Sequence, residues 1–366
     1  MDHPGLNTFD SIQRNTLSLV ANASLSDTQW VQASLPIKEG GLGIRRVESL
    51  ALPSFISSAI STSPLQEEIL AQCRGVPETT VPKLTTRWSA VFGSVPVGTA
   101  ASKQAAWDFS IVAADKALVL YNLHSPREKA GFLAASAPHA GAWLSALPLA
   151  TCGLRLDEEA VRVAVALRLG LRLCQPHDCR CGAPVDVWGS HAMICKRAAG
   201  RTTRHFAVND IIARAITAAG TPVSKEPSGI LQGSAKRPDG ITLVPWRGGR
   251  ALAWDATIAS TLADSYLEAS STQAGSASES ASARKVTKYM GLPSDFSFQP
   301  VALESLGPAC SSTAAFISDL GRRIAVVSGE PREELFLWQR ISICLQRYNA
   351  VLLHQSFINQ EEALDE

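Results

Sequence analysis

The stretch RPDGITLVPWRGGRALAWDAT, residues 237–257, has the pattern of a β-hairpin. Its two apolar runs, 240–246 and 250–257, are separated by an Arg-Gly-Gly sequence, which is typical of a turn between antiparallel strands. Asp239 stands before the first run, and Asp255 lies near the end of the second. Aspartates on adjacent antiparallel strands can converge on one divalent cation, so the hairpin predicts a small sheet that carries a candidate metal site.

Helices and a further strand are predicted around this hairpin. We expect a helix at 203–219, part of a helix at 284–290 and a strand at 296–303. The stretch 261–283 is rich in Ser, Ala and Thr and is expected to contain a loop. The order helix, strand, strand, helix, strand over 203–303 predicts a small α/β unit with a small mixed sheet.

The remaining chain is predicted to be mainly helical. Apolar residues recur near helical spacing in three segments of residues 1–150, namely 9–21, 47–62 and 102–120. A strong helix at 157–173 begins at Asp157, a suitable N-cap, and two helices close the chain at 313–327 and 331–357. The fold class is therefore mixed, with four predicted regions: a helical part at 1–150, a linker helix with a Cys/His cluster at 151–200, an α/β core at 201–330 and a C-terminal helix at 331–366.

A glycine-rich stretch, LPIKEGGLGIRR at residues 35–46, has two interpretations. It could be a phosphate-binding loop, but it lacks the Gly-Lys-Ser/Thr ending that a P-loop needs. A turn between two helices is the favoured interpretation.

Composition sets only broad limits on function. The chain has 366 residues, a net charge of +1 and 46% hydrophobic residues, which suits two or three globular domains. A net charge this close to zero favours no class of partner, so any basic surface that binds nucleic acid must be local. There is no apolar run of about 18 residues, so we expect no membrane span, and residues 1–14 lack the apolar core of a secretory signal.

Half of the eight cysteines fall in CQPHDCRCGAPVDVWGSHAMIC, residues 174–195. Thiolates and imidazole are the donors that zinc prefers, and four such ligands make a closed structural site. The preferred ligands are Cys179, Cys181, His191 and Cys195. Because only one residue separates Cys179 from Cys181, Cys174 could replace Cys179. The alternative to a zinc site is a metal-free loop with incidental cysteines.

The acidic pair of the hairpin predicts a second, catalytic metal site. Asp239 and Asp255 could bind Mg²⁺ or Mn²⁺, which polarises a phosphate and lowers the pKa of a bound water. Glu226 could add a third carboxylate. In nucleases that bind a divalent cation through two acids, a lysine is commonly found two residues after the second acid. Here that position holds Thr257.

A replacement for that lysine is available further along the chain. Lys285, Lys288 and Tyr289 are three and four residues apart, so one helical face can present all of them. A lysine there can orient the attacking water and balance charge in the transition state.

A basic patch begins the helix before the hairpin. Arg201, His205 and Asn209 are four residues apart and share a helical face, with Arg204 nearby. Such a patch can neutralise phosphates, and the alternative is a solvated helix start. The candidate nucleic-acid contacts are Arg201, Arg204, His205, Asn209 and Arg237, which precedes the first acid.

The order of these patterns resembles the C-terminal region of polyproteins from non-LTR retrotransposons that carry a restriction-like endonuclease. Cys-x-Cys-Gly…His-x3-Cys, Arg-His-x3-Asn, Arg-Pro-Asp, Asp-Ala-Thr and Lys-x2-Lys-Tyr follow one another over about residues 170–310. The resemblance implies a zinc knuckle beside an α/β PD-(D/E)XK core of the restriction-endonuclease type. It puts the acids on Asp239 and Asp255, the lysine on Lys285 or Lys288, and the Arg-His-Asn motif on the basic helix.

The N-terminal half carries a weaker likeness. Residues 35–43 are similar to the segment after the reverse-transcriptase palm in such elements, so 1–150 resembles a thumb or linker. The Tyr/Phe-x-Asp-Asp polymerase signature does not occur in the sequence. We therefore expect no RNA-copying activity, and a fragment, truncated copy or domesticated remnant of a larger element.

Three hypotheses of function follow. The first is a metal-dependent endonuclease that nicks DNA. The second is a zinc-dependent nucleic-acid-binding protein with an idle nuclease pocket, and the third is a relic that still folds. The resemblance also implies DNA, and element RNA, as partners, no membrane, and a nuclear location.

Overall fold

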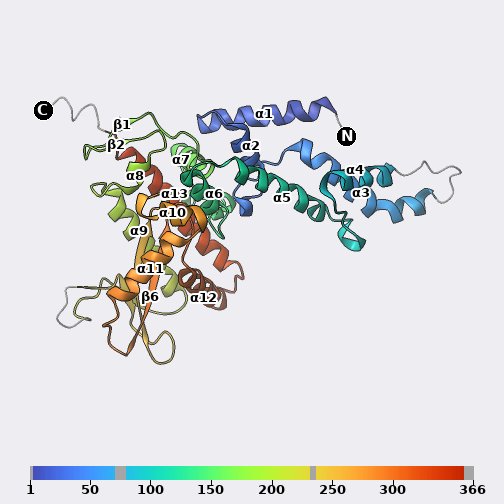
Figure 1. Ribbon diagram of the computed structural model, residues 1–366. Coiled ribbons are helices and arrows are strands. Elements are labelled where there is room, and N and C mark those ends of the chain that lie inside the picture. Colours follow the sequence, from blue (N-terminus) through green and yellow to red (C-terminus); the bar gives the residue numbers. More distant parts are fainter. Residues whose placement is uncertain (1–2, 71–79, 231–235, 358–366) are drawn as a thin grey trace. The chain divides into compact units, whose positions relative to one another are not determined.

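The computed structural model describes residues 3–70, 80–230 and 236–357 (Figure 1). Within these ranges the chain divides into two compact units, which we describe separately. The first comprises Met1–Val20, Ser24–Pro36 and Gly41–Leu123, and the second Ala21–Ala23, Ile37–Gly40 and His124–Glu366. Residues 124–150 therefore group with the second unit and not with the N-terminal helical region. No described helix is long and apolar enough to cross a membrane.

The first unit is helical, as the sequence predicts. Its helices are α1 (Pro4–Ala21), α2 (Asp27–Ser34), α3 (Val47–Leu70), α4 (Thr80–Phe92) and α5 (Gln104–Asn122). Three of them, α1, α3 and α5, correspond to the predicted segments, whereas α2 and α4 lie outside those segments. The core gathers Ile56, Trp88, Trp107 and Ile111, with the two tryptophan rings edge to face at 5.2 Å.

The glycine-rich stretch forms the turn between α2 and α3, through a short 3-10 helix η1 (Ile37–Glu39). Gly41 is required there, because a Cβ on this residue would lie 2.0 Å from the Leu35 carbonyl oxygen. Asp10 then caps α3, its carboxylate accepting from the Val47 amide at 2.8 Å and from the Glu48 amide at 3.2 Å. The favoured interpretation, a turn between two helices, therefore agrees with the structure.

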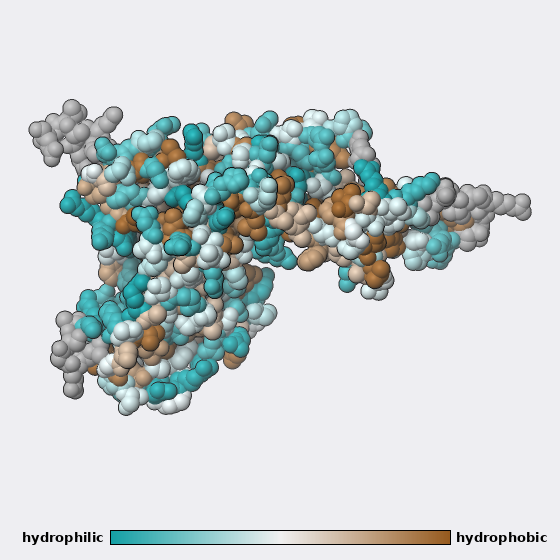
Figure 2. All heavy atoms as spheres, viewed as in Figure 1, coloured by the Kyte–Doolittle hydropathy of each residue, from teal (hydrophilic) through white to brown (hydrophobic). Residues whose placement is uncertain are grey.

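Large apolar side chains lie at the surface of the first unit. Figure 2 shows brown patches over the α3–α5 part, and the exposed large hydrophobic residues of this unit include Phe55, Ile69, Phe109 and Tyr121. Phe109 and Tyr121 are 75% and 82% exposed.

The second unit is a mixed α/β structure. Its helices are α6 (Pro126–Ala135), α7 (Glu158–Leu169), α8 (Ser190–Ile194), α9 (Gly200–Ala218), α10 (Asp264–Thr272), α11 (Ser276–Lys288), α12 (Ser311–Ser328) and α13 (Glu333–His354). Its strands are β1 (His177–Asp178), β2 (Pro184–Val185), β3 (Val223–Lys225), β4 (Gly240–Thr242), β5 (Ala251–Ala259) and β6 (Phe296–Glu304). Asp157 caps α7 as predicted, accepting from the Ala160 amide at 2.7 Å.

The central sheet has the strand order β3-β4-β5-β6. The first three strands are antiparallel, and β6 runs parallel to β5, so the sheet is mixed. Gly240 of β4 faces Trp254 of β5, and a Cβ on Gly240 would lie 2.1 Å from that indole ring. The predicted hairpin turn is present, with positive φ at Gly248 and Gly249, as a tight two-residue connection requires.

Helices cover both faces of this sheet. Alternating residues of β5 and β6, such as Leu252, Trp254 and Val301, pack into a core with α9, α12 and α13. On the other face, Ala277 and Ala281 of α11 pack against Ala302. Since side chains alternate along a strand, Asp255 points to the α11 face.

The loop expected within 261–283 is confined to residues 261–263 and 273–275, because α10 and α11 occupy the rest of that stretch. The small residues that suggested a loop let α11 approach the sheet closely, and they are buried at Ala277, Ser278 and Ala281. Glu304, at the end of β6, accepts from the Ser278 amide in the first turn of α11 at 3.0 Å. The three-residue strand β3 also fell outside the predicted segments, since so short a run has no sequence periodicity.

Candidate functional site

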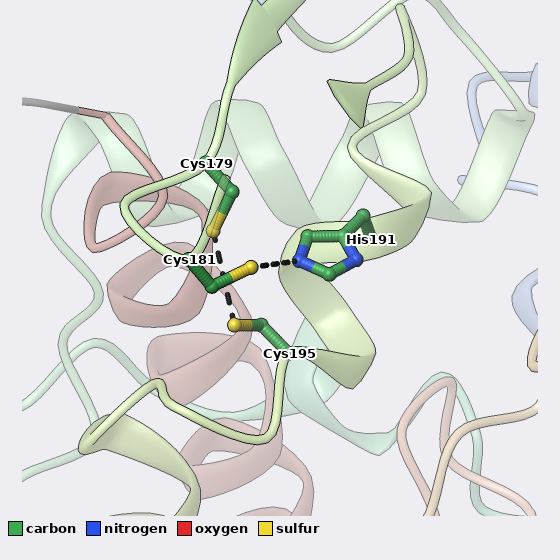
Figure 3. A group of neighbouring side chains, drawn as sticks. All are labelled: Cys179, Cys181, His191 and Cys195. Carbon is green, nitrogen blue, oxygen red and sulfur yellow. Dashed lines mark hydrogen bonds between the residues drawn. The ribbon is translucent and has the colours of Figure 1, made fainter. Parts of the chain in front are cut away.

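A small hairpin brings the first two cysteines of the cluster together. β1 pairs antiparallel with β2, and Cys179 and Cys181 lie in the turn between them. The Cys179 amide donates to the Ala183 carbonyl at 2.9 Å, and the Gly182 amide donates to the Cys179 carbonyl at 2.7 Å. These bonds hold the Cys-x-Cys sequence as a tight loop, with both thiols on the same side (Figure 3).

The short helix α8 supplies the other two donors. His191 lies within it and Cys195 is its C-cap, so their four-residue spacing puts them on one helical face. The donor atoms of Cys179, Cys181, His191 and Cys195 all lie within 4.8 Å of one another (Figure 3). Cys179 Sγ is 3.8 Å from Cys195 Sγ, and Cys181 Sγ is 3.1 Å from His191 Nε2.

This donor set could bind zinc. Tetrahedral zinc–thiolate bonds of about 2.3 Å put neighbouring sulfurs about 3.8 Å apart. That edge length matches the 3.8 Å between Cys179 and Cys195. Four donors would close the coordination sphere and leave no position for a substrate, as in a structural site. Cys174 is not one of the four, because its thiol bonds the Asp186 carbonyl oxygen at 3.3 Å.

The thiols differ in acidity before any metal binds. The Ala183 backbone amide lowers the pKa of Cys181 to about 7, whereas burial raises the pKa of Cys179 to about 11. Zinc binds thiolates and releases their protons, so Cys181 is ready to bind and Cys179 must lose its proton on binding.

The cluster is anchored to the end of α13. His177 Nε2 lies 2.8 Å from Ser356 Oγ, and its ring stacks on Phe357 with centroids 4.0 Å apart. The Gly200 amide donates to Gln355 Oε1 at 2.7 Å. The residues following α13 therefore tie the Cys/His hairpin and the start of α9 together.

Asp239 precedes β4 and is held in place by α9 and β5. Its Oδ2 accepts from His205 Nε2 at 2.9 Å and from the Ala256 amide at 2.6 Å. Asn209 Nδ2 donates to the Asp239 carbonyl at 3.1 Å, and Trp254 Nε1 donates to Asn209 Oδ1 at 2.7 Å. The hairpin thus brings the Asp239 carboxylate to the backbone just after Asp255.

Asp255 lies on β5 and is buried, with 3% of its side chain exposed. Lys285, Lys288 and Tyr289 all reach this carboxylate from the end of α11. The Lys288 Nζ–Oδ2 distance is 3.1 Å, and the Tyr289 hydroxyl also contacts the Arg237 carbonyl at 2.5 Å. Burial and the neighbouring Asp255 raise the pKa of Tyr289, so its hydroxyl stays protonated.

The structure therefore brings together both predicted acids and the predicted Lys-x2-Lys-Tyr group. Sequence separation is large, since Lys285 follows Asp255 by 30 residues. Lys285 of α11 thus reaches the Asp255 carboxylate, whereas the position two residues after Asp255 holds Thr257.

Glu226 and Arg237 have a different arrangement from the one expected. Arg237 Nη2 forms an ion pair with Glu226 Oε2 at 2.8 Å, and the Glu226 amide donates to the Asp239 carbonyl at 3.0 Å. Glu226 is also one of the described non-glycine residues with positive φ, at 49°. Its carboxylate therefore holds Arg237, which is exposed, and Glu226 is not grouped with the two aspartates as a metal ligand.

The basic helix does not present its four residues to solvent as one face. Arg201 is exposed and His205 half-buried, whereas Arg204 and Asn209 are each only 3% exposed. Asn209 positions the Asp239 backbone from inside the core, so it is not a surface contact. Arg204 Nη1 donates to Asn349 Oδ1 of α13 at 3.3 Å. Neither Asn349 nor the Ala256 amide has a local sequence signal, because each meets its partner only through the fold.

A cavity of about 340 Å³ opens beside the acidic pair. It is lined by side chains from the end of the Cys/His cluster, the first turns of α9, the end of β5 and α11, including Lys196, Arg201, Arg204, His205, Thr257 and Lys285. None of the described residues lining it is acidic. The charged side chains among the described residues that line the cavity are therefore all basic.

No protein-family model matches this chain, and no curated protein matches its sequence.

Proposed function

We propose that this chain is a divalent-metal-dependent DNA endonuclease of the PD-(D/E)XK type, derived from a non-LTR retrotransposon and acting in the nucleus. The observation that carries the proposal is the Asp255 carboxylate, buried and contacted by Lys285, Lys288 and Tyr289, next to the Asp239 carboxylate. Acid and lysine side chains that converge beside a cavity are typical of functional sites.

The donor chemistry suits a hard divalent cation. Asp239 and Asp255 offer carboxylate oxygens, which Mg²⁺ and Mn²⁺ prefer, and two carboxylates leave positions for water and phosphate. When bound, such a cation polarises the scissile phosphate and lowers the pKa of a bound water.

The chain's own residues have separate roles around that cation. Asp239 is held by Ala256 and His205, so its carboxylate needs little reorganisation to bind metal. Lys285 bonds Oδ1 of Asp255 and also lines the basic cavity, so its ammonium group is the one that can balance charge on the phosphate. Lys288 and Tyr289 hold the other oxygen, Oδ2.

The experiment is nicking of supercoiled plasmid DNA by the full chain, with Mg²⁺, with Mn²⁺ and with neither. Asp239→Asn and Asp255→Asn keep the size of each side chain and remove its charge, and Glu268→Gln, on the exposed surface of α10, is the matched control. The proposal expects nicking that needs the metal, survives Glu268→Gln and is lost in both aspartate variants. Equal nicking by Asp255→Asn and the native chain would overturn it.

A second candidate is a zinc-dependent nucleic-acid-binding protein with an idle nuclease site. Two lysine ammonium groups and a tyrosine hydroxyl already contact Asp255. The two positive charges weaken its attraction for a metal ion, which favours this alternative. It expects DNA or RNA binding that survives Asp255→Asn and is lost on Cys195→Ser, with no metal-dependent nicking by the native chain.

A further inference from the structure

Arg204 is a buried cation whose partners are too weak for its charge. It is 3% exposed, and its hydrogen bond to the neutral amide of Asn349 is long at 3.3 Å. Its Nε has no hydrogen-bond partner within the described parts of the chain, and no carboxylate there pairs with it. Burial and the neighbouring Arg201 lower the pKa of Arg204 to about 10, so the guanidinium still carries its charge at neutral pH.

A buried and unpaired charge is costly, because desolvation of the ion is not offset by an opposite charge. The same unit contains a second buried arginine, Arg168, which serves as a comparison. Arg168 is 6% exposed and donates to the Ile37 carbonyl at 2.7 Å. Arg204 differs because it lines the basic cavity, which points to an anion as its missing partner.

The cavity has the charge and size of an anion site. Arg204 lies on its wall with the exposed Lys196 and Arg201, and no acidic residue is among the described residues that line it. The first turn of α9 contributes Arg201 and Thr202, so the positive end of a 19-residue helix dipole adds to the same field. Its volume of about 340 Å³ lies within the range of about 300–1,000 Å³ typical of ligand sites.

Two residues connect this cavity to the acidic pair. Lys285 lines it and bonds Asp255, and His205 lines it and bonds Asp239. An anion in the cavity would therefore lie next to whatever the two aspartates bind. Along a nucleic-acid strand, the group next to one phosphodiester is another phosphate.

We propose that this cavity binds a backbone phosphate of DNA beside the one held at Asp239 and Asp255, with Arg204 as its buried anchor. The phosphate replaces the missing counter-ion of Arg204, while Lys196 and Arg201 contact it from the solvent side. Its place next to the cleaved bond rests on the proposed endonuclease function, but the binding of a DNA phosphate does not.

The test is binding of a short duplex to the zinc-loaded full chain without added Mg²⁺, measured by fluorescence anisotropy across a series of salt concentrations. Arg204→Gln removes one phosphate contact, so we expect an affinity loss of about tenfold and a salt slope smaller by about one. Arg168→Gln removes a matched buried arginine away from the cavity and should leave both values unchanged. Unchanged affinity and slope in folded Arg204→Gln would overturn the proposal.

Two further variants keep the test valid if Arg204→Gln does not fold. Thr257→Asp places a carboxylate in the cavity and should weaken duplex binding, and Arg201→Gln changes only an exposed side chain and should lower the salt slope by about one. Full binding by both variants would contradict the proposal. Competition with inorganic phosphate separates the sources: displacement of the duplex only at high phosphate concentration supports a backbone site, whereas Arg204-dependent phosphate binding without any effect on DNA would overturn it.

The outcome is separable from that of the endonuclease proposal. Binding that depends on Arg204, in a chain that does not nick DNA, would keep the phosphate site and remove the nuclease. Metal-dependent nicking by a chain whose DNA binding does not depend on Arg204 would keep the nuclease and remove the phosphate site.

Discussion

Lys285 on α11 forms an ion pair with Asp255 on β5, although the two residues lie 30 positions apart in the sequence. The pair joins the helix on one face of the sheet to the strand that carries the proposed catalytic acid. Lys285 also lines the basic cavity, which Lys288 does not. This difference between two neighbouring lysines leads to the first prediction.

Lys285→Met is expected to reduce the single-turnover rate of plasmid nicking by about 100-fold or more. The reason is that it removes the charge that contacts Asp255 and lines the basic cavity. Lys288→Met should reduce the rate by less than about tenfold, since Lys288 contacts only the far oxygen of the carboxylate. Equal losses in the two variants would mean that neither lysine has a distinct role.

Cys179→Ser and Cys195→Ser are expected to lose bound zinc, which can be measured by elemental analysis of the purified chain. Cys174→Ser is the control and should keep one zinc per chain, because its thiol bonds a carbonyl and lies outside the cluster. Loss of zinc should also lower the thermal unfolding temperature, since the cluster contacts the residues after α13. A zinc content that falls in Cys174→Ser but not in Cys179→Ser would contradict this ligand set.

Asn209→Ala is expected to lower the free energy of unfolding by about 1–3 kcal/mol, because it leaves the buried Trp254 indole N–H without an acceptor and removes one of the two donors to the Asp239 carbonyl. Chemical denaturation of the second unit within the full chain measures the effect. Thr272→Ala removes an exposed side-chain bond at the end of α10, in the same unit, and should cost less than about 0.5 kcal/mol. Equal costs at both sites would show that the Asn209 bridge adds no stability.

The contribution of Glu304 to stability is expected to fall as the pH rises through the interval between the ordinary and the raised pKa of this group. This carboxyl group is fully buried, and burial raises its pKa above the ordinary value of 4.5. The folded chain therefore binds a proton that the unfolded chain has released, so unfolding becomes easier with increasing pH between the two pKa values. Glu304→Gln removes this titration, and its unfolding free energy should change less than that of the native chain between pH 5 and pH 8. An identical pH dependence in both chains would contradict the assignment.

Features set by neighbouring residues could be predicted from the sequence. The hairpin, its Arg-Gly-Gly turn and the Asp157 cap depend on side-chain alternation, on glycine at positive φ and on a short polar side chain before a helix. These are interactions over a few residues, so the sequence pattern contains them. The Cys/His cluster is similar, since its donors lie within 17 consecutive residues, Cys179 to Cys195.

Only the tertiary structure decided the remaining questions. From spacing alone, either Cys174 or Cys179 could serve as a ligand. In the structure, Cys179 lies in the β1–β2 turn with its thiol in the cluster, whereas Cys174 precedes β1 and its thiol bonds a carbonyl. The small residues that suggested a loop form α11 instead, because the central sheet buries them. Nothing in the sequence around α11 indicates that sheet. Arg204 and His205 are adjacent in a basic run, yet the contact with α13 buries the first and leaves the second half exposed. Burial depends on elements that meet over a hundred residues apart, and spacing within one helix carries no information about that contact.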